Sequence, residues 1–375
     1  MLPFRPTWIW HIMTNHTPKP FNSGIHGARG LFCLCVVFYH IWNSGLPRWP
    51  VPMIVEQAME SLRYGVELFF AISGFVIFAT LKPVLNGNKS PLEFIANRAT
   101  RIFPVLWVTI IIFIPLGIID GEQSVAAHLQ PIWLFNLKLI GNLLALGPIW
   151  PVPVFYGVTW TIGYEFIFYC LCFAYLCGHY YLNRNLIWPV LLIASVLVLY
   201  HPRGLFFASG ILVAAQVLNT PLIRKLAAWP VFWLVAFLFS WQTMAAPVSP
   251  FFAPMLDWSI YSEWPTAGLA FISLTLGIAG IVNGSGLFCR LLTTNPMLWL
   301  GSISYSLYLW HPIVLGATKF AMNRLGWNTM AGDGAQFLLL LLALPSSLIV
   351  SQLSYAILER KLTNWLRRHV QPAAA

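Results

Sequence analysis

The stretch GARGLFCLCVVFYHIWNSG, residues 27–45, is an apolar run that carries two ionisable side chains, Arg29 and His40. Ten residues separate them, so along a helix they lie about 16 Å apart, roughly half the thickness of a bilayer's hydrocarbon core. If Arg29 lies at one membrane surface, His40 lies near the middle. An ionisable group at that depth is costly to keep and is by default a candidate for function. The alternative is a buried histidine whose hydrogen bonds are satisfied by a neighbouring helix.

The whole chain has the composition of a protein that crosses a membrane many times. Its 375 residues are 58% hydrophobic and only 9% charged, whereas soluble domains carry about 25% charged residues. The net charge of +10 comes from basic residues beside apolar runs, as loops on the cytoplasmic side of a membrane require. We therefore expect an all-α, polytopic protein embedded in the lipid bilayer, and no nucleic-acid partner.

Apolar segments recur along the chain, and basic residues orient them. The candidate spans are 27–45, 65–82, 102–119, 131–147, 158–178, 186–200, 204–219, 229–246, 266–283, 301–318 and 335–358. Lysines and arginines cluster before the first candidate, between the second and third, and after the last. Because basic residues favour the cytoplasmic side, both termini are predicted to be cytoplasmic.

The number of crossings follows from this orientation. Both termini on one side require an even number, and 131–147 is the weakest candidate because it contains two asparagines and a lysine. We therefore predict about ten transmembrane helices, with 120–157 as an outer segment that lies on or dips into the membrane. The predicted division is a cytoplasmic N-terminal segment, 1–24, a transmembrane domain, 25–360, and a cytoplasmic basic tail, 361–375.

Further polar groups fall within the spans at depths that this topology fixes. Glu165 and His311 share the middle-to-outer half of the membrane with His40, so the three could line one cavity. Arg98 and Arg101 share the inner end with Arg29. The remaining candidates near these groups are Glu67, Ser73, Trp160, Tyr164 and Tyr305.

The arrangement of these groups suggests a chemistry. Arginines at a cytoplasmic mouth suit a phosphate-bearing ligand, and a histidine–carboxylate set above them suits removal of a proton from a hydroxyl. Each group also has a purely structural interpretation: arginines orient spans, buried glutamate and histidine bridge helices, and tryptophan and tyrosine form interfacial belts. We see no pattern of metal ligands and expect no metal site.

Four blocks of the sequence resemble the integral-membrane acyltransferase-3 family. They are Arg29-x10-His40, GVELFFAISGF at 65–75, Arg98-x-x-Arg101 and GSISYSLYLWH at 301–311. The segment WTIGYEFIFY at 160–169 also resembles a segment of the family. The chain departs from the family pattern after Glu359, where Arg360 and Lys361 follow in place of an expected proline.

The resemblance implies an enzyme of the bacterial cytoplasmic membrane, of the short polysaccharide O-acetyltransferase type. Such an enzyme moves an acyl group, acetyl in particular, from cytoplasmic acyl-CoA to a hydroxyl of an extracytoplasmic or lipid-linked glycan. Acyl-CoA is then a donor substrate, and no cofactor is bound permanently. Two other functions remain open: a proton-coupled transporter, and a noncatalytic partner of a polysaccharide export machine.

The enzymatic hypothesis assigns roles to the candidate residues. His40 is expected to act as general base or as a covalent acyl carrier, with Glu165 or Glu67 orienting its imidazole. Tyr305 and Ser73 are weaker candidates for binding the acyl oxygen. The expected ligands of the acyl-CoA phosphates are Arg29, Arg98 and Arg101.

Overall fold

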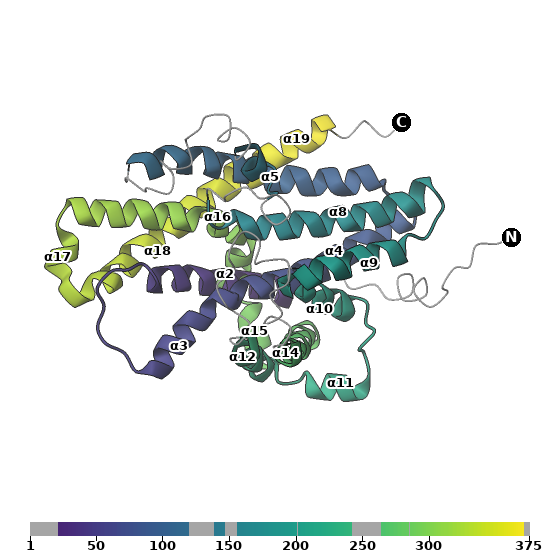
Figure 1. The fold of residues 1–375 in the computed structure, drawn as a ribbon, viewed down its shortest axis with the longest axis horizontal. Helices are drawn as coiled ribbons and strands as arrows, with labels where there is room; N and C mark the ends of the chain where they lie inside the picture. The colour runs from purple at the N-terminus through teal and green to yellow at the C-terminus, as the bar shows by residue number, and fades with distance from the viewer. Residues whose placement is uncertain are drawn as a thin grey trace.

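The computed structural model describes residues 22–119, 139–146, 156–200, 202–241, 264–284 and 286–370. This part of the chain is helical and contains no strand, which confirms the all-α prediction (Figure 1). The long helices are α2 (Ser23–Trp42), α4 (Gly65–Leu85), α5 (Pro91–Ile119), α8 (Thr159–Tyr181), α14 (Trp264–Asn283), α16 (Asn295–Arg324) and α18 (Ala335–Ser354). Of the predicted segments 1–24 and 120–157, only residues 22–24, 139–146 and 156–157 are described.

Short helices connect and extend the long ones. They are α3 (Met53–Ser61), η1 (Leu62–Tyr64), α9 (Ile187–Tyr200), η2 (Pro202–Gly204), α10 (Leu205–Ala214), α11 (Pro221–Leu226), α12 (Pro230–Trp241), α15 (Leu287–Leu292), α17 (Trp327–Ala331), η4 (Gly332–Gly334), η5 (Tyr355–Leu362) and α19 (Thr363–Val370). In Figure 1, α2 runs through the centre, with α5 and α8 above it, while α12 and α14 lie below and are seen nearly end-on.

Apolar helices make this a multi-pass membrane protein. Among the described residues, 6 helical runs are long and apolar enough to cross a bilayer: Ser23–Trp42, Met53–Leu85, Pro91–Leu116, Thr159–Tyr181, Thr266–Asn283 and Trp327–Arg368. Three shorter apolar helices, Ile187–Leu199, Pro202–Ala214 and Pro230–Trp241, add to these. The predicted ninth span falls within the 30-residue α16. The count of ten and the sides of the termini stay predictions.

Both ends of α2 are fixed by hydrogen bonds to groups that would otherwise be unpaired. At its start, the Asn22 side chain accepts from the Ile25 N–H at 2.9 Å, as an N-cap does. At its end, Gln336 Nε2 donates to the carbonyls of Ile41 and Trp42 at 3.2 and 2.6 Å. The helix that carries Arg29 and His40 is therefore held at both ends.

α2 and α16 run parallel and cross closely through glycines. A Cβ added to Gly301 would lie 2.1 Å from the carbonyl oxygen of His26, and one added to Gly30 would lie 2.6 Å from the Gly301 nitrogen. Small residues permit such an approach in membrane helices. One turn farther on, the Cys33 thiol lies 3.3 Å from the Ser304 carbonyl oxygen, so contacts advance along both helices in the same direction.

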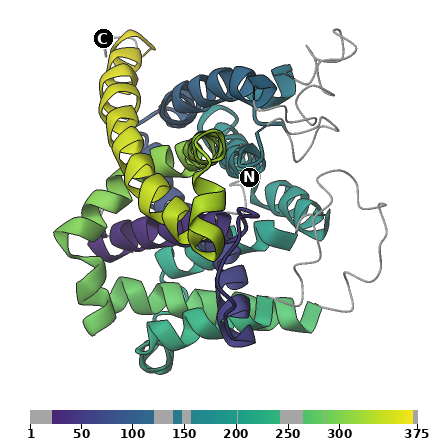
Figure 2. The same ribbon diagram turned by 90° about the vertical axis from the view of Figure 1, so that its left-hand side faces the viewer.

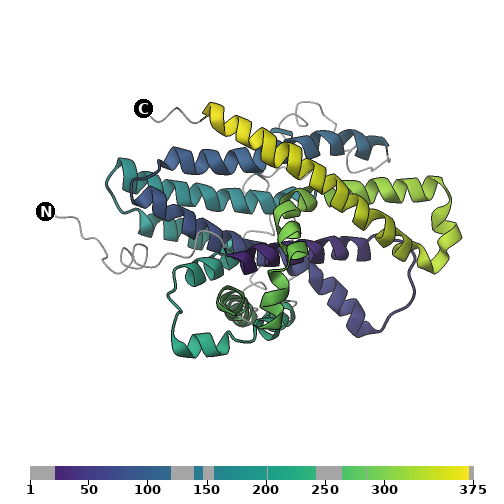
Figure 3. The ribbon, with the colours of Figure 1, turned by 180° about the vertical axis from the view of Figure 1, so that it is seen from behind.

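The run from α18 through η5 to α19 continues beyond the predicted end of the transmembrane domain. Figure 3 shows it as one long rod across the back of the molecule, and Figure 2 shows the same rod from the side. Thr363 Oγ1 donates to the Thr100 carbonyl at 3.1 Å, and Arg367 Nη2 donates to the Asn97 carbonyl at 3.4 Å. The basic residues after Leu358 thus end the apolar run but not the helix, and the segment packs against α5.

Candidate active site

His40 of α2 and His311 of α16 lie side by side. Their ring centroids are 5.1 Å apart, at an interplanar angle of 45°. The parallel crossing of the two helices explains this contact, because each histidine follows its crossing glycine, Gly30 or Gly301, by ten residues. His311 is fully buried and His40 partly buried. The predicted shared location of His40 and His311 is therefore observed in the structure.

The hydrogen bonding of His311 leaves one ring nitrogen available. Its Nδ1 lies 3.1 Å from the Leu307 carbonyl oxygen. A carbonyl can only accept, so Nδ1 carries a proton and, in the neutral ring, Nε2 carries a lone pair. That Nε2 is buried and has no hydrogen-bond partner. A buried acceptor without a partner is costly, so this nitrogen is suited to receive the O–H of an incoming group.

A small cavity next to Arg29 is connected to the histidine pair through one shared neighbour, Tyr308. Tyr308 lines the cavity, and its ring centroid lies 5.9 Å from that of His311. The hydroxyl of Tyr308 is held by Thr161, whose Oγ1 lies 2.9 Å away. The cavity has a volume of about 40 Å³, which is room for water-sized groups. Its polar lining is formed by Arg29, Ser73, Thr161, Glu165, Ser304, Tyr305 and Tyr308.

Glu165 lies at the Arg29 end of this cavity and not beside the histidines. It accepts hydrogen bonds from Ser73 Oγ at 2.8 Å and from the Tyr169 hydroxyl. Arg29 is within electrostatic range of this carboxylate. The packing of α8 against α4 turns the Glu165 carboxylate toward Ser73, so a single cavity shared by Glu165 and the two histidines stays a prediction. Glu165 does not orient the His40 ring by direct contact, and its catalytic role stays a prediction.

The arginines form a cationic cluster beyond Glu165. Arg29 and Arg98 both lie within electrostatic range of Arg101. Arg98 Nη2 donates to Thr80 Oγ1 at 2.9 Å, and its guanidinium lies 5.6 Å from the centroid of the Tyr169 ring. Sequence reasoning missed Arg367 of α19, which lies within range of Arg98 and Arg101. This concentration of positive charge suits a phosphate-bearing ligand.

Glu359 also reaches this region, from the π-helical stretch η5. Its Oε1 accepts from the Ser306 hydroxyl at 2.5 Å and from the Ser306 N–H at 3.1 Å. π-helical turns often occur at functional sites. In this chain the carboxylate ties η5 to α16 and adds a negative group within range of Arg29.

Glu67 belongs to a separate polar cluster. It is fully buried, pairs with Arg203 of η2 at 3.0 Å, and accepts from Trp241 Nε1 at 3.0 Å. Trp160 stacks edge-on against Tyr164 with centroids 5.6 Å apart, and the Arg203 guanidinium lies 5.1 Å from the centroid of the Trp160 ring. Arg203 and Trp241 both contact Oε1 of Glu67, while its buried Oε2 has no hydrogen-bond partner among the described residues, and a role of Glu67 in orienting His40 stays a prediction.

The close approach of α4 and α10 builds this second cluster. A Cβ on Gly210 would lie 1.8 Å from the Ala71 carbonyl oxygen, and one on Gly74 would lie 2.0 Å from that of Phe207. This contact holds η2, which precedes α10, against the start of α4. Tyr305, in contrast, donates to the Ile102 carbonyl at 2.7 Å. Its hydroxyl is thus committed to α5 and is not free to bind an acyl oxygen.

Comparison with known proteins gives a family match over most of the chain. A model described as an acyltransferase domain matches residues 22–356. The exopolysaccharide production protein ExoZ of Rhizobium meliloti (strain 1021) is 26% identical over 309 residues, covering 80% of this chain and 88% of that protein. No solved structure matches.

Two further relatives are longer than this chain. The putative peptidoglycan O-acetyltransferase YrhL of Bacillus subtilis (strain 168) is 23% identical over 393 residues, covering 94% of this chain and 56% of the relative. The O-acetyltransferase OatA of Staphylococcus aureus (strain NCTC 8325 / PS 47) is 25% identical over 342 residues, covering 81% of this chain and 52% of that relative. The chain thus spans about half the length of these two relatives.

Proposed function

Because this chain belongs to the membrane acyltransferase family whose domain model it matches, we propose that it transfers an acetyl group from acyl-CoA on the cytoplasmic side to a hydroxyl of an extracytoplasmic glycan. The acceptor class is drawn from relatives named for exopolysaccharide production and for peptidoglycan O-acetylation. The donor is proposed from the chemistry of the arginine cluster.

The observation that carries the proposal is a series of polar groups along α2 and its neighbours, in which Tyr308 lies between the Arg29 cavity and His311. It starts at the arginine cluster of Arg98 and Arg101, passes the Arg29 cavity, and ends at His40 and His311. One end suits the phosphates of a donor and the other suits a base. Along α2 the series covers the distance from Arg29 to His40, about 16 Å, which an extended pantetheine arm can follow.

Donor binding places the nucleotide phosphates at the arginines and the thioester near the histidines. A guanidinium binds phosphate in a bidentate manner and stays charged. The cavity of about 40 Å³ is too small for a pantetheine arm. Access of the donor therefore requires the helices around Arg29 to separate, and Arg29 is the group that a passing thioester arm meets first inside the bundle.

The chemical step uses the histidine pair as base. His40 takes the proton of the acceptor hydroxyl while the oxygen attacks the thioester carbonyl carbon. A C–O bond forms, the C–S bond breaks, and the imidazolium returns the proton to the thiolate that leaves. His311 Nε2 carries a lone pair and has no hydrogen-bond partner in the described part of the structure, so it can accept from the acceptor hydroxyl, or from the protonated ring of His40, and hold that group in line for transfer.

Acetyl transfer in membrane vesicles tests the proposal. Inverted vesicles expose the cytoplasmic face, so labelled acetyl-CoA added outside should yield base-labile acetyl ester on glycan inside. Vesicles that contain the chain should form this product, and vesicles without it should not. Label that accumulates inside as unreacted donor would indicate a transporter, and vesicles that need a second protein for any turnover would indicate a noncatalytic partner.

A further inference from the structure

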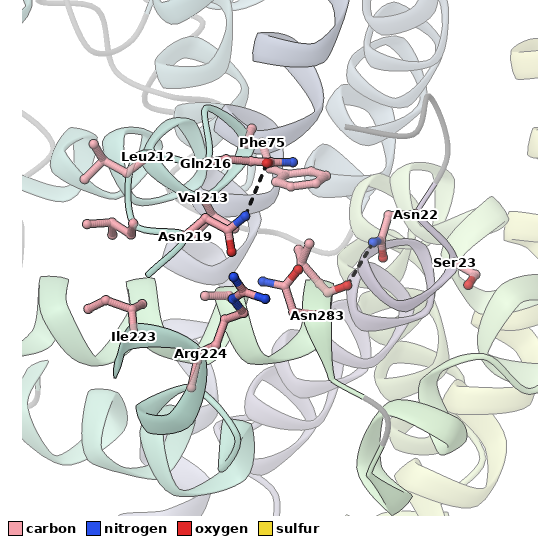
Figure 4. A pocket seen from close by; sticks show the side chains of 15 residues that line it. Asn22, Ser23, Phe75, Leu212, Val213, Gln216, Asn219, Ile223, Arg224 and Asn283 are labelled. Carbon is pink, nitrogen blue, oxygen red and sulfur yellow. Dashed lines mark hydrogen bonds between the residues drawn. The ribbon is translucent and has the colours of Figure 1, made fainter. Parts of the chain in front are cut away.

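A second cavity lies at the start of α2, at the opposite end of that helix from His40. It has a volume of about 470 Å³ and lies between α4, α10, α11, α14 and the start of α2. Figure 4 shows its polar side chains: Asn219 and Arg224 reach toward each other from two sides, and Asn283 lies beside the guanidinium. The cavity is at the end of the bundle that the charge pattern assigns to the cytoplasmic side, because Arg224 and Lys225 occur there.

The polar groups of this cavity have unused hydrogen-bonding capacity. Among the described residues, the guanidinium of Arg224 has neither an ion pair nor a hydrogen bond, and the Asn283 side chain has no hydrogen bond. Within the same described part of the chain, the Asn219 side chain makes one long hydrogen bond, from Nδ2 to Gln216 Oε1 at 3.4 Å. These three side chains are exposed at the edge of the cavity and point into it (Figure 4), so they are available to a polar ligand that enters it.

The backbone at Gln216 also favours a role for this cavity. Gln216 follows α10 with φ of 56°, in the left-handed region, where glycine is the usual residue after a helix. A glutamine in that conformation is strained relative to glycine. Its side chain lines the cavity. The chain therefore has a side-chain amide at a position where the backbone conformation favours glycine.

Charge selects the class of ligand. The residues that line the cavity include Arg224 and no carboxylate. One guanidinium suits one negative charge, as in a phosphodiester. The amides of Gln216, Asn219 and Asn283 suit hydroxyl groups, which both donate and accept. A headgroup with an ammonium would find no carboxylate partner here.

The surroundings indicate that the ligand is part of the membrane. Leu222 and Leu226 of α11 are exposed on one face of that helix, one turn apart, and Trp229 beyond them is 72% exposed. Tryptophan at such a position is typical of the membrane interface. Arg224 faces the cavity from the same short helix, so a phosphate held there lies next to an apolar surface for acyl chains.

We propose that this cavity binds the headgroup of an anionic, hydroxyl-bearing glycerophospholipid, of which phosphatidylglycerol is the simplest example. Arg224 holds the phosphodiester, the three amides hold the headgroup hydroxyls, and the acyl chains lie along Leu222, Leu226 and Trp229. Basic pockets between membrane helices bind anionic headgroups in this manner. The proposal does not depend on the acyl-transfer reaction, and its test needs no turnover.

Lipid binding to the purified chain tests it. The full chain is stripped of lipid in a neutral detergent and titrated with phosphatidylglycerol, while native mass spectrometry and the melting temperature report binding. Arg224→Gln should weaken binding by about tenfold or more, because a charge-assisted contact to phosphate is lost. Lys225→Gln is the matched control, since Lys225 is adjacent in sequence but does not line the cavity, and it should bind as wild type does.

A second variant and two other ligands make the test decisive. Asn283→Leu keeps the arginine and should also weaken binding, by less than Arg224→Gln. Phosphatidylcholine, whose headgroup carries an ammonium, should compete poorly. The proposal is overturned if both variants bind phosphatidylglycerol as tightly as wild type, or if phosphatidylcholine binds equally well. It is also overturned if soluble glycerol phosphate displaces the lipid at equal concentration, because the ligand would then come from the cytoplasm.

Discussion

The imidazole rings of His40 and His311 lie 5.1 Å apart because each residue follows the glycine of one helix crossing by the same ten positions. α2 and α16 are parallel there, so the ten-residue advance is shared and the two rings arrive at one depth. The close contact of the two rings thus requires the Gly30–Gly301 crossing as well as the two histidines. We expect function to depend on the crossing and on the histidines.

The His311→Asn variant distinguishes the role of Nδ1 of His311 from that of Nε2. The asparagine amide can still donate to the Leu307 carbonyl, as Nδ1 does, but it offers nothing in place of Nε2. We expect turnover to fall by about 100-fold or more, the usual scale for a group engaged in proton transfer, with little change in melting temperature. If His311 only joins helices, the asparagine variant will retain most of its activity.

Gly301→Ala tests the helix crossing. The new methyl group would lie 2.1 Å from the His26 carbonyl oxygen, so α2 and α16 must move apart. We expect a loss of about 1–3 kcal/mol in stability, the usual cost of overpacking, together with reduced turnover. Gly316→Ala, in the same helix with no atom within 4 Å of the added carbon, is the control and should not destabilise the protein. Equal melting temperatures for the two variants would contradict the close crossing.

Arg203→Met tests whether Glu67 is structural. It leaves a fully buried carboxylate without its cation, which costs about 3–5 kcal/mol in comparable buried pairs. The melting temperature should therefore fall sharply, and the double variant with Glu67→Leu should regain part of the loss. If Glu67 instead acts in catalysis, Glu67→Gln will abolish turnover while leaving the melting temperature unchanged.

Arg98→Ala tests the donor site. Removal of a charge-assisted phosphate contact worth about 1.5–3 kcal/mol should raise the KM for acyl-CoA about tenfold or more, with a smaller effect on the KM for glycan. Thr80→Val is the matched control, because it removes the hydrogen bond that holds Arg98 and leaves the charge in place. Steady-state kinetics give the KM for acyl-CoA. If this KM is unchanged in Arg98→Ala, Arg98 does not bind the donor and serves only to orient its helix.

The sequence predicts the histidine pair well, because depth along a helix follows directly from residue number. Arg29, Arg98 and Arg101 gather at one end for the same reason. The partners of Glu165 are not predictable in this way. α8 is apolar around most of its circumference, so its sequence does not say which face meets α4, and the contact with Ser73 depends on that rotation.

The sequence also does not predict the partners of Arg203 and Arg367, because the connections between helices determine where these two residues lie. Arg203 lies in a three-residue turn between two apolar helices, and only the close contact of α4 with α10 brings it to Glu67. Arg367 falls after the apolar run and is predicted to lie in a tail. Because the helix continues through η5 into α19, Arg367 returns to α5 and joins the arginine cluster. Hydropathy marks the end of a membrane segment but not the end of a helix.

The most direct test of the central claim is acetyl transfer by His40→Ala and His40→Gln in inverted vesicles, measured beside the melting temperature of each purified variant. Glutamine can hydrogen-bond but is not a useful base. The account predicts that both variants insert, melt close to wild type, still bind acetyl-CoA, and form no acetylated glycan. Well-folded His40→Ala that acetylates glycan at a near-normal rate would contradict the assignment of His40 as the base.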